Sequence, residues 1–591
     1  MFTKCDASSL AYIRIVVGIL LLIDLVYERG LSRAELIWGN PNECRFPLFD
    51  GLKVLPLRAM FAVYTLMFIG VVGIILGYKY KMSCFIYIIN YWYLFLLDKS
   101  RWNNHSYLFG LLVTLLSICD ANCQWSLDRF LNKQMDNRVA FWQYFLIKSQ
   151  IFFVYFMAGI KKFDTDWLNG YSMNYLSEHW VFRPFRLILS NESIDYYVIH
   201  LGGFLFDLTI GFFLICSYTQ SIAYIFCLIF NLMNSRLFSI GMFPYMMIAV
   251  MPVFSAYDWP KNMIQLICNK KSNKIESNCK SIKRYNSDKQ NKFSSKHRLT
   301  FVFVIIYIIS QLLLPNSHWI TKGYNTWTNG LYGYSWDMMV HNWKHIHTTI
   351  TVVDKSMNKF YLNPQSWTQS MRWSHHSDMV KQYVMCAHKR LVNEFNITDP
   401  SIFVDTWISL NGRFAQRVYD PRVDLVKAEW TPFKRPDWVL PILSYLADWR
   451  QKLKQYEYEL YKDNNQTAVI FMADFPGMTL NYYMGSEFNN TSLVVLKGWL
   501  KHQIVGQSTR IMSTGDQMVL PVNCYHKLTP IKSETSAYMF IYVNSSLSFI
   551  NHITSQSHNQ NHSTKNTNNE SENISHNPWF QSLQNMWSGI T

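Results

Sequence analysis

The stretch that decides the fold is residues 150–167, QIFFVYFMAGIKKFDTDW, in which an apolar run ends at a pair of lysines. Such a run is typical of a helix that crosses a bilayer, and lysines commonly anchor a helix of this kind at its end. A lysine held in an apolar pocket behaves differently, because loss of hydration disfavours its charged form and lowers its pKa. The Lys161–Lys162 pair is therefore either an interfacial anchor or the source of a general base.

Apolar runs of the same kind recur along the first half of the chain. Spans are predicted near residues 10–27, 59–77, 83–97, 107–119, 145–160, 197–216, 220–234, 237–254 and 299–315. Several are shorter than the roughly 20 residues that a straight span needs, so nine is a working number. Hydrophobic residues make up 50% of the chain and charged ones only 16%, which excludes a wholly water-soluble protein.

The loop at 260–298 sets the expected orientation, since it carries many lysines and arginines against Glu276 and Asp288. Such a loop stays in the cytosol, and an odd number of spans then places the N-terminus in the cytosol and everything after residue 315 in the lumen. The net charge of +16 is explained as loop charge on a membrane protein. Because no nucleic-acid-binding motif accompanies that charge, membrane lipid and not nucleic acid is the expected partner.

The C-terminal half agrees with this orientation. It carries the Asn-X-Ser/Thr pattern of N-glycosylation eight times, and none of the eight lies in the basic loop. The predicted glycosylation sites are Asn396, Asn465, Asn490 and Asn544.

The expected fold class is a polytopic α-helical membrane protein with a C-terminal lumenal α+β domain. Its domains are predicted as a transmembrane domain at 1–315, a lumenal region at 316–465, a β-rich module at 466–548 and a largely disordered tail at 549–591. Short β-type runs separated by turns predict a small antiparallel sandwich or barrel in the β-rich module.

Two further polar groups lie close to the apolar runs. His105, in WNNHSY, is expected on the same membrane face as Lys162, where it either orients that lysine or is an ordinary interfacial histidine. Asp207 lies inside the run HLGGFLFDLTIGFF. An acidic group at membrane depth is costly and usually paired, so Asp207 is either a functional group or a buried contact that positions two helices.

Residues 323–341, GYNTWTNGLYGYSWDMMVH, suit an aromatic pocket, although an interface belt has the same composition. Several histidines follow, but their spacing matches no familiar ligand set, so no metal is predicted. The run GDQMVLPVNCYHKL at 515–528 is superficially similar to the second half of a cupin metal motif. It lacks the partner motif, which favours a plain β-turn.

Six segments together resemble the vitamin K-dependent γ-glutamyl carboxylase family. They are WNNHSYLFGLL, FMAGIKKFDTDWLNGYSMNYLSEHW, NSRLFSIGMF, GYNTWTNGLYGYSWDMMVH, RFAQRVYDPRVD and MADFPG, within a similarity that extends from about residue 10 to 545. The resemblance implies a lyase of the endoplasmic reticulum membrane that converts glutamates of secreted, propeptide-bearing proteins to γ-carboxyglutamate. Its implied co-substrate is vitamin K hydroquinone, with O2 and CO2 as substrates.

The resemblance also implies roles for particular residues. Lys162 corresponds to the family's base, and His105 to the histidine that would keep it neutral. The positions associated with glutamate binding and epoxidation are Leu331, Tyr332, Ser335, Trp336 and His341. Those of the propeptide-recognition stretch are Trp430, Lys434, Arg435 and Trp438, and the family's disulfide falls on Cys44 and Cys386.

Two other functions remain open at this point. A homologue that has lost the chemistry could serve as a binding or retention protein for propeptide-bearing clients. The spans alone would also suit a transporter, although the large lumenal half and the lack of an internal repeat of spans argue against that function.

Overall fold

The computed structural model describes residues 1–173, 175–268, 295–329, 333–463, 467–504, 509–531 and 533–544. Most of the basic loop, the tail beyond residue 548, and the predicted site residues Leu331 and Tyr332 lie outside these ranges. The chain divides into two compact units. Met1–Thr321 and Thr328–Val340 form the first, and Lys322–Trp327 belongs with the chain from His341 onward to the second. The aromatic segment is thus divided between the two units.

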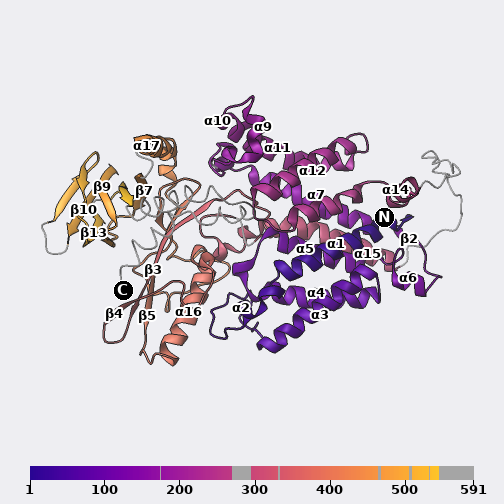
Figure 1. The fold of residues 1–591 in the computed structure, drawn as a ribbon. Coiled ribbons are helices and arrows are strands. Elements are labelled where there is room, and N and C mark those ends of the chain that lie inside the picture. The colour runs from indigo at the N-terminus through magenta and orange to yellow at the C-terminus, as the bar shows by residue number, and fades with distance from the viewer. Residues whose placement is uncertain are drawn as a thin grey trace, which may run out of the picture. The chain divides into compact units, whose positions relative to one another are not determined.

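The first unit is helical (Figure 1). Its longer helices are α1 (Ser8–Tyr27), α3 (Leu57–Leu76), α4 (Tyr80–Leu97), α5 (Asn104–Ile118), α7 (Phe141–Lys162), α11 (Gly202–Ile215), α12 (Gln220–Leu237) and α15 (Ser295–Leu313). Shorter ones are α2 (Ala34–Trp38), α6 (Leu127–Leu131), α8 (Thr165–Leu168), α9 (Arg183–Arg186), α10 (Asn191–Ser193), α13 (Phe243–Val250) and α14 (Trp259–Ile267). Strands β1 (Lys4–Asp6) and β2 (Arg138–Ala140) pair with each other. Every one of the predicted spans overlaps a helix, and the span at 237–254 corresponds to the short α13.

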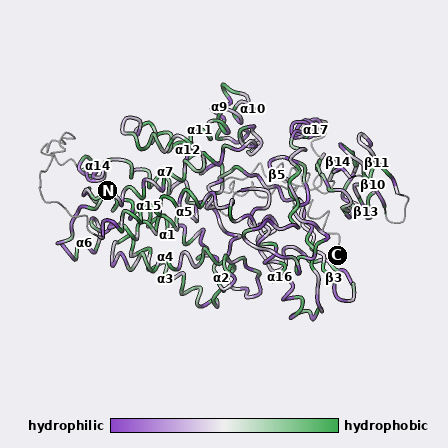
Figure 2. Tube along the Cα trace, turned by 180° about the vertical axis from the view of Figure 1, so that it is seen from behind, coloured by the Kyte–Doolittle hydropathy of each residue, from purple (hydrophilic) through white to green (hydrophobic). Residues whose placement is uncertain are grey.

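Among the described residues, five helical segments are long and apolar enough to cross a membrane, and two more apolar helices are shorter. Figure 2 shows the hydrophobic colour concentrated on these helices. Helices α4 and α12 have 18 residues each, but tyrosines, asparagines and a lysine or arginine interrupt their apolar residues. The polytopic helical fold is confirmed, and the spans differ in how apolar they are.

Neighbouring helices are tied by buried polar contacts as well as by apolar packing. Arg14 of α1 is fully buried and donates to the carbonyl groups of Ile74, at 3.1 Å, and of Trp125, at 2.6 Å. Ile74 lies in the last turn of α3, where carbonyl groups lack helical partners further along the chain, and Trp125 lies in the loop before α6. A buried arginine of this kind fixes α1 against the end of α3.

The second unit contains three antiparallel four-stranded sheets. The first sheet has the order β4-β3-β5-β6, from β3 (Trp343–Val353), β4 (Lys359–Leu362), β5 (Ser401–Leu410) and β6 (Gln416–Arg417), and α16 (Ser377–Asn393) follows β4 in the chain. Sequence analysis did not predict this sheet. The run WKHIHTTITVV of β3 does alternate between more and less buried residues, which is the signal of a strand.

The other two sheets form the β-rich module. Their orders are β11-β10-β13-β8 and β12-β9-β14-β7, and α17 (Arg450–Asp463) precedes them. The strands are β7 (Thr467–Asp474), β8 (Leu480–Met484), β9 (Phe488–Lys497), β10 (Trp499–Ile504), β11 (Arg510–Ser513), β12 (Gln517–Val519), β13 (Cys524–Pro530) and β14 (Ser536–Asn544). One apolar cluster draws on both sheets, including Tyr482, Leu500 and Phe540. The prediction of an antiparallel β-rich module is confirmed.

Arg417 links the first sheet to this module. Its side chain is buried, and its guanidinium donates to Asp405 of β5 at 2.9 Å and to Asp474 of β7 at 2.6 Å. It also donates to the carbonyl of Thr479 at 2.8 Å. Removing one partner of a buried pair leaves the opposite charge uncompensated, and this is strongly destabilising.

Replacement of Arg417 should therefore loosen the junction between the sheets. Arg417→Met is expected to lower the free energy of local unfolding at β7 by about 3–5 kcal/mol, measured by hydrogen exchange of the β7 amides. Arg422→Met is the matched control, because its pair with Asp420 is at the surface, and it should cost less than about 1 kcal/mol. Equal losses in the two variants would contradict this.

The module also encloses a pair of histidines. His502 of β10 and His526 of β13 are buried, with 2.9 Å between His502 Nε2 and His526 Nδ1. His526 Nε2 lies 2.9 Å from the carbonyl oxygen of Pro521, an arrangement in which both rings are neutral. Burial lowers the pKa of His502 to about 4, and it also lowers the pKa of His526.

These shifts predict an acid-sensitive module. The unfolded histidines bind protons below about pH 6.5, whereas folded His502 does so only near pH 4, so the free energy of unfolding should fall as the pH drops through this window. His502→Gln keeps a donor for His526 but cannot titrate, and should flatten the dependence. Hydrogen exchange of β10 and β13 at pH 7 and 5, corrected for intrinsic rates, measures the effect. A variant as acid-sensitive as the wild type would contradict the assignment.

Candidate active site

The core of the candidate site is a buried ion pair between two helices. Lys162 is the last residue of α7, and its side-chain nitrogen is bonded to the carboxylate of Asp207 in α11. The side chains of Lys162 and Asp207 are only 5% and 3% exposed. In an apolar bundle neither charge could be buried alone at acceptable cost, so each group stabilises the other.

Small residues bring α7 and α11 close enough for this contact. A Cβ atom added at Gly159 would lie 2.6 Å from the backbone nitrogen of Leu208, the residue after Asp207. A Cβ at Gly211, one turn further along α11, would lie 2.6 Å from the ring of Phe152. Residues three apart share a helix face, so the approach at Gly159 brings Lys162 to Asp207.

Trp167 covers the ion pair from the following turn. The Lys162 nitrogen lies 5.0 Å from the centroid of the Trp167 ring, a cation–π distance. The indole nitrogen of Trp167 donates to the carbonyl of His200 at 2.8 Å. His200 belongs to a π-helix, Ile194–Leu201, which leads into α11. Such π-helical turns are frequent at functional sites.

Lys162 and Trp167 open onto an apolar cavity of about 450 Å³. Its other lining residues are Met173, Leu176, Phe182, Phe185, Val198, Ile199, Gly202, Gly203, Phe206, Phe226, Ile229, Phe230, Met233, Asn234, Leu237, Phe238 and Met339. The volume and the aromatic walls suit a flat, lipid-soluble ring, and most of the cavity offers such a ligand only apolar contacts. The exceptions are Lys162, which is paired with Asp207 behind the lining, and Asn234.

The pair can act as a base for a weakly acidic hydroxyl. Taken together it carries no net charge, and it can accept one proton without the protein having to bury an isolated anion. An apolar cavity also excludes water, which strengthens the interaction between the pair and any charge formed beside it.

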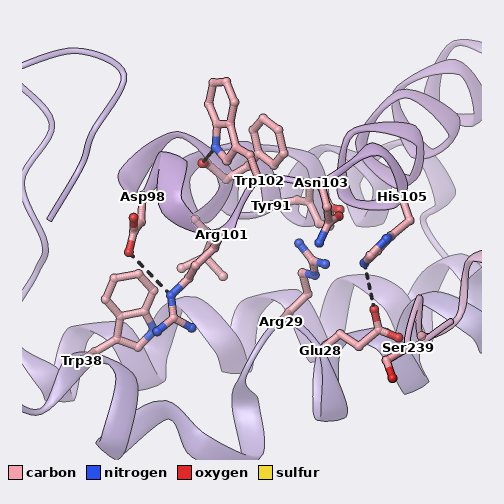
Figure 3. Close-up of a pocket in the computed structure, with 13 residues that line it drawn as sticks. Glu28, Arg29, Trp38, Tyr91, Asp98, Arg101, Trp102, Asn103, His105 and Ser239 are labelled. Atoms are coloured by element: carbon pink, nitrogen blue, oxygen red, sulfur yellow. Dashed lines mark hydrogen bonds and ion pairs between the residues drawn. The ribbon is translucent and has the colours of Figure 1, made fainter. Parts of the chain in front are cut away.

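His105 occupies a second, more polar cavity. It lies in the first turn of α5, and its Nε2 is 3.3 Å from a carboxylate oxygen of Glu28 (Figure 3). Glu28 also accepts from the backbone nitrogen of Met242 at 2.6 Å. Gly241 makes this approach possible, because a Cβ there would fall 1.9 Å from the carboxylate. The structure thus pairs Lys162 with Asp207 and gives His105 a different partner, Glu28.

The described part of the aromatic segment in the first unit packs against α5. Ser335 and Trp336 are buried, and the Trp336 ring lies 5.7 Å from that of Tyr107. A Cβ on Gly333, whose φ is +83°, would lie 2.4 Å from the backbone of Asn103. His341 belongs to the second unit.

The residues predicted to recognise a propeptide lie in a surface loop of the second unit. Trp438 is buried, and its indole donates to the carbonyl of Glu429 at 3.2 Å, so it anchors the loop. Trp430 donates to the carbonyl of Gly323 at 3.0 Å. Lys434, Arg435 and the neighbouring Phe433 are exposed. The sequence grouped four residues by role, and the structure separates exposed cations from structural tryptophans.

The remaining predicted positions are distributed as follows. Cys44 and Cys386 are both disulfide-bonded. Asn396 and Asn490 are exposed, as an acceptor for glycosylation must be, whereas Asn465 and the Asn544 side chain lie outside the description. Among the residues that the structure describes, no group of three or more His, Cys, Asp or Glu side chains is arranged to hold a metal ion.

Two family models match the chain in succession. Residues 2–259 match the HTTM domain, and residues 296–445 match the lumenal domain of vitamin K-dependent gamma-carboxylase. Together they define a polytopic membrane protein with a lumenal domain. The chain belongs to the vitamin K-dependent γ-carboxylase family.

Solved structures match over a small part of the chain. The plu4264 protein from Photorhabdus luminescens is 16% identical over 15% of this chain and 75% of its own, with a TM-score of 0.14. A Cupin 2 conserved barrel domain protein from Salinispora arenicola is 13% identical over 15% of this chain and 72% of its own, also with a TM-score of 0.14. At such TM-scores the likeness supports no conclusion.

Three parts of the site were missed by sequence analysis. Gly159 and Trp167 lie in the segment that was noticed for Lys162, whereas Glu28 directly follows the first predicted span. Gly159 had a readable signal, since a glycine one turn before a buried lysine permits close helix packing. Glu28 had none, because its partner His105 is far away in the sequence.

The close approach at Gly159 gives a testable prediction. Gly159→Leu should push α7 away from α11 and cost about 1–3 kcal/mol or more, seen as a lower midpoint of thermal unfolding in detergent. Gly51→Leu is the matched control, because a Cβ at Gly51 meets nothing within 4 Å. An unchanged midpoint for Gly159→Leu would mean that the helices are not in tight contact.

Proposed function

We propose that the protein carboxylates peptidyl glutamate to γ-carboxyglutamate and couples this to epoxidation of vitamin K hydroquinone. The observation that carries the proposal is the Lys162–Asp207 pair, buried at the edge of an apolar cavity. Membership of the carboxylase family supports the same reaction.

The reaction must solve an energetic problem. The γ-proton of glutamate is far too weakly acidic for any side chain to remove it directly. Oxidation of the quinol by O2 supplies the driving force, with one oxygen atom entering the epoxide and the other leaving as water. The γ-carbon loses its proton and forms a bond to CO2, so atoms and electrons balance.

In this proposal the protein's own part begins with the quinol hydroxyl. When the shared proton of the pair lies on Asp207, the neutral amine of Lys162 accepts the quinol proton, and Asp207 holds the lysine in position and keeps the resting pair neutral overall. Trp167 packs over the lysine and restricts its access to water. General-base catalysis of this type contributes about 10²–10⁴-fold to a rate.

The apolar cavity would hold the quinol and keep water out. Its rings and aliphatic side chains fit a naphthoquinol with an isoprenoid tail, which could enter from the bilayer. Water must be absent, because a base strong enough to remove a γ-proton would otherwise be quenched by solvent.

The second unit would select the protein substrate. The exposed loop with Phe433, Lys434 and Arg435 offers one apolar and two cationic groups, which suit a propeptide with an apolar face and acidic neighbours. The proposed location is the endoplasmic reticulum membrane, with the second unit in the lumen. Its exposed asparagine acceptors and the disulfide-bonded cysteines are consistent with that oxidising compartment.

Incorporation of labelled CO2 into a Glu-containing peptide tests the proposal. Purified protein in detergent, supplied with reduced vitamin K, should label the peptide only when quinol and O2 are both present. Lys162→Ala should lower the rate by about 100-fold or more. Lys161→Ala is the matched control and should retain activity, since Lys161 bonds to the carbonyl of Pro315 at 2.8 Å and not to Asp207.

Two outcomes would overturn parts of the proposal. Labelling that survives Lys162→Ala would assign the base to another group. Absence of labelling by folded wild-type protein that still binds a propeptide would indicate a non-catalytic binding protein.

A further inference from the structure

The polar cavity around His105 has a volume of about 330 Å³. Its lining is Glu28, Arg29, Trp38, Tyr91, Leu94, Phe95, Asp98, Arg101, Trp102, Asn103, His105, Ser239 and Gly241 (Figure 3). Charged and aromatic groups thus alternate around one space, which suits a ligand with an ionised end and an apolar stem. The proposed quinol chemistry leaves this cavity without a role.

The two carboxylates of the wall are already engaged. Glu28 is held by His105 and by the backbone of Met242. Asp98 accepts from the backbone nitrogen of Ser100 at 3.0 Å, and Arg101 Nε lies 3.5 Å from it. Both carboxylates therefore have partners within the protein, and neither needs one from a ligand.

Arg29 differs from these groups. Its Nε lies 3.1 Å from the buried carboxylate of Asp24, which holds the base of the guanidinium in place. The side chain is only 13% exposed and its Cζ lies 5.8 Å from the centroid of the Tyr91 ring, and among the described residues its two terminal nitrogens donate no hydrogen bond. A guanidinium fixed through Nε presents the parallel N–H pair that binds a carboxylate in bidentate fashion.

The position of the cavity relates it to the site of Lys162. Leu237 and Phe238 line the apolar cavity, whereas Ser239 and Gly241, directly after them, line the polar one. One short segment therefore lines both cavities. A glutamyl side chain in the polar cavity would hold its γ-carbon beside this segment, with its methylene groups against Trp38, Tyr91 or Trp102.

We infer that Arg29 binds the γ-carboxylate of the substrate glutamate in this polar cavity. The inference rests on the proposed function and adds the subsite for the second substrate. Loss of a proton from the carbon next to a carboxylate creates a second negative charge, which delocalises onto the carboxylate oxygens. A bidentate guanidinium stabilises that charge where it develops, and stabilisation of this kind lowers the barrier.

Binding of matched peptides tests Arg29 without requiring turnover. One fluorescent peptide carries a single glutamate and its twin carries glutamine, and both are titrated by anisotropy with oxidised quinone present. Wild-type protein should prefer the glutamate peptide by about tenfold or more, the size expected for a hydrogen-bonded charge. Arg29→Lys and Arg29→Gln should reduce the preference below about threefold.

Controls separate binding from folding. Arg33→Gln removes a nearby exposed charge that does not line the cavity, and should retain the full preference. Thermal unfolding shows whether Arg29→Gln alone is folded. If it is not, the double variant Asp24→Asn with Arg29→Gln is used instead, because it leaves no unpaired buried carboxylate. In the labelling assay, the variants should raise KM for the peptide and leave KM for the quinol unchanged.

The outcomes distinguish this inference from the proposed function. Arg29-dependent preference in a protein that does not incorporate CO2 would uphold the subsite and overturn the reaction. If the protein carboxylated the peptide and folded Arg29 variants kept the full preference for glutamate over glutamine, the reaction would be upheld and the subsite overturned. If bicarbonate displaced both peptides equally and the protein showed no preference for glutamate, the Arg29 guanidinium would be the site of a smaller anion. The assignment to the glutamyl carboxylate would then be wrong.

Discussion

The first unit depends on one constraint, which is that charge buried in an apolar helical bundle must be paired. Lys162 and Asp207 meet that constraint together. Their contact requires α7 and α11 to approach so closely that only a glycine fits at position 159. The close crossing at Gly159, the indole over the lysine and the π-helical turn that accepts from that indole all follow from it. A change in any one of them would move the base relative to the cavity wall.

The division of labour between the two cavities follows from polarity. A quinol with a long hydrocarbon tail gains most in a cavity lined by Phe, Leu and Met, and needs one polar contact at its hydroxyl. A carboxylate is instead stabilised by a fixed fork of donors, which Arg29 offers only because Asp24 holds it from behind. Two ligands of opposite solubility can thus be brought to either side of the short segment from Leu237 to Gly241.

Much of this could be predicted from the sequence, and the limits are physical. Apolar runs predict helices because burial depends on composition, so all the predicted spans overlap helices. Asp207 was predicted as a costly, paired group for the same reason. Its partner could not be derived, because the contact depends on how two helices cross. Strand β3 was missed since its histidines drew attention to metal chemistry, whereas the alternation along the strand was the informative feature.

The identity of the lysine's partner has a physical rationale of its own. A histidine beside Lys162 could lower the lysine's basicity but could not neutralise its charge, so a lysine protonated from solvent before the ligand binds would be an unbalanced cation in an apolar cavity. A carboxylate gives a pair that is neutral overall whether the shared proton lies on nitrogen or oxygen. Only after it accepts a further proton does the pair become positive, and at that moment the ligand that lost the proton is negative. Opposite charges then appear together, where the low dielectric makes their attraction strongest.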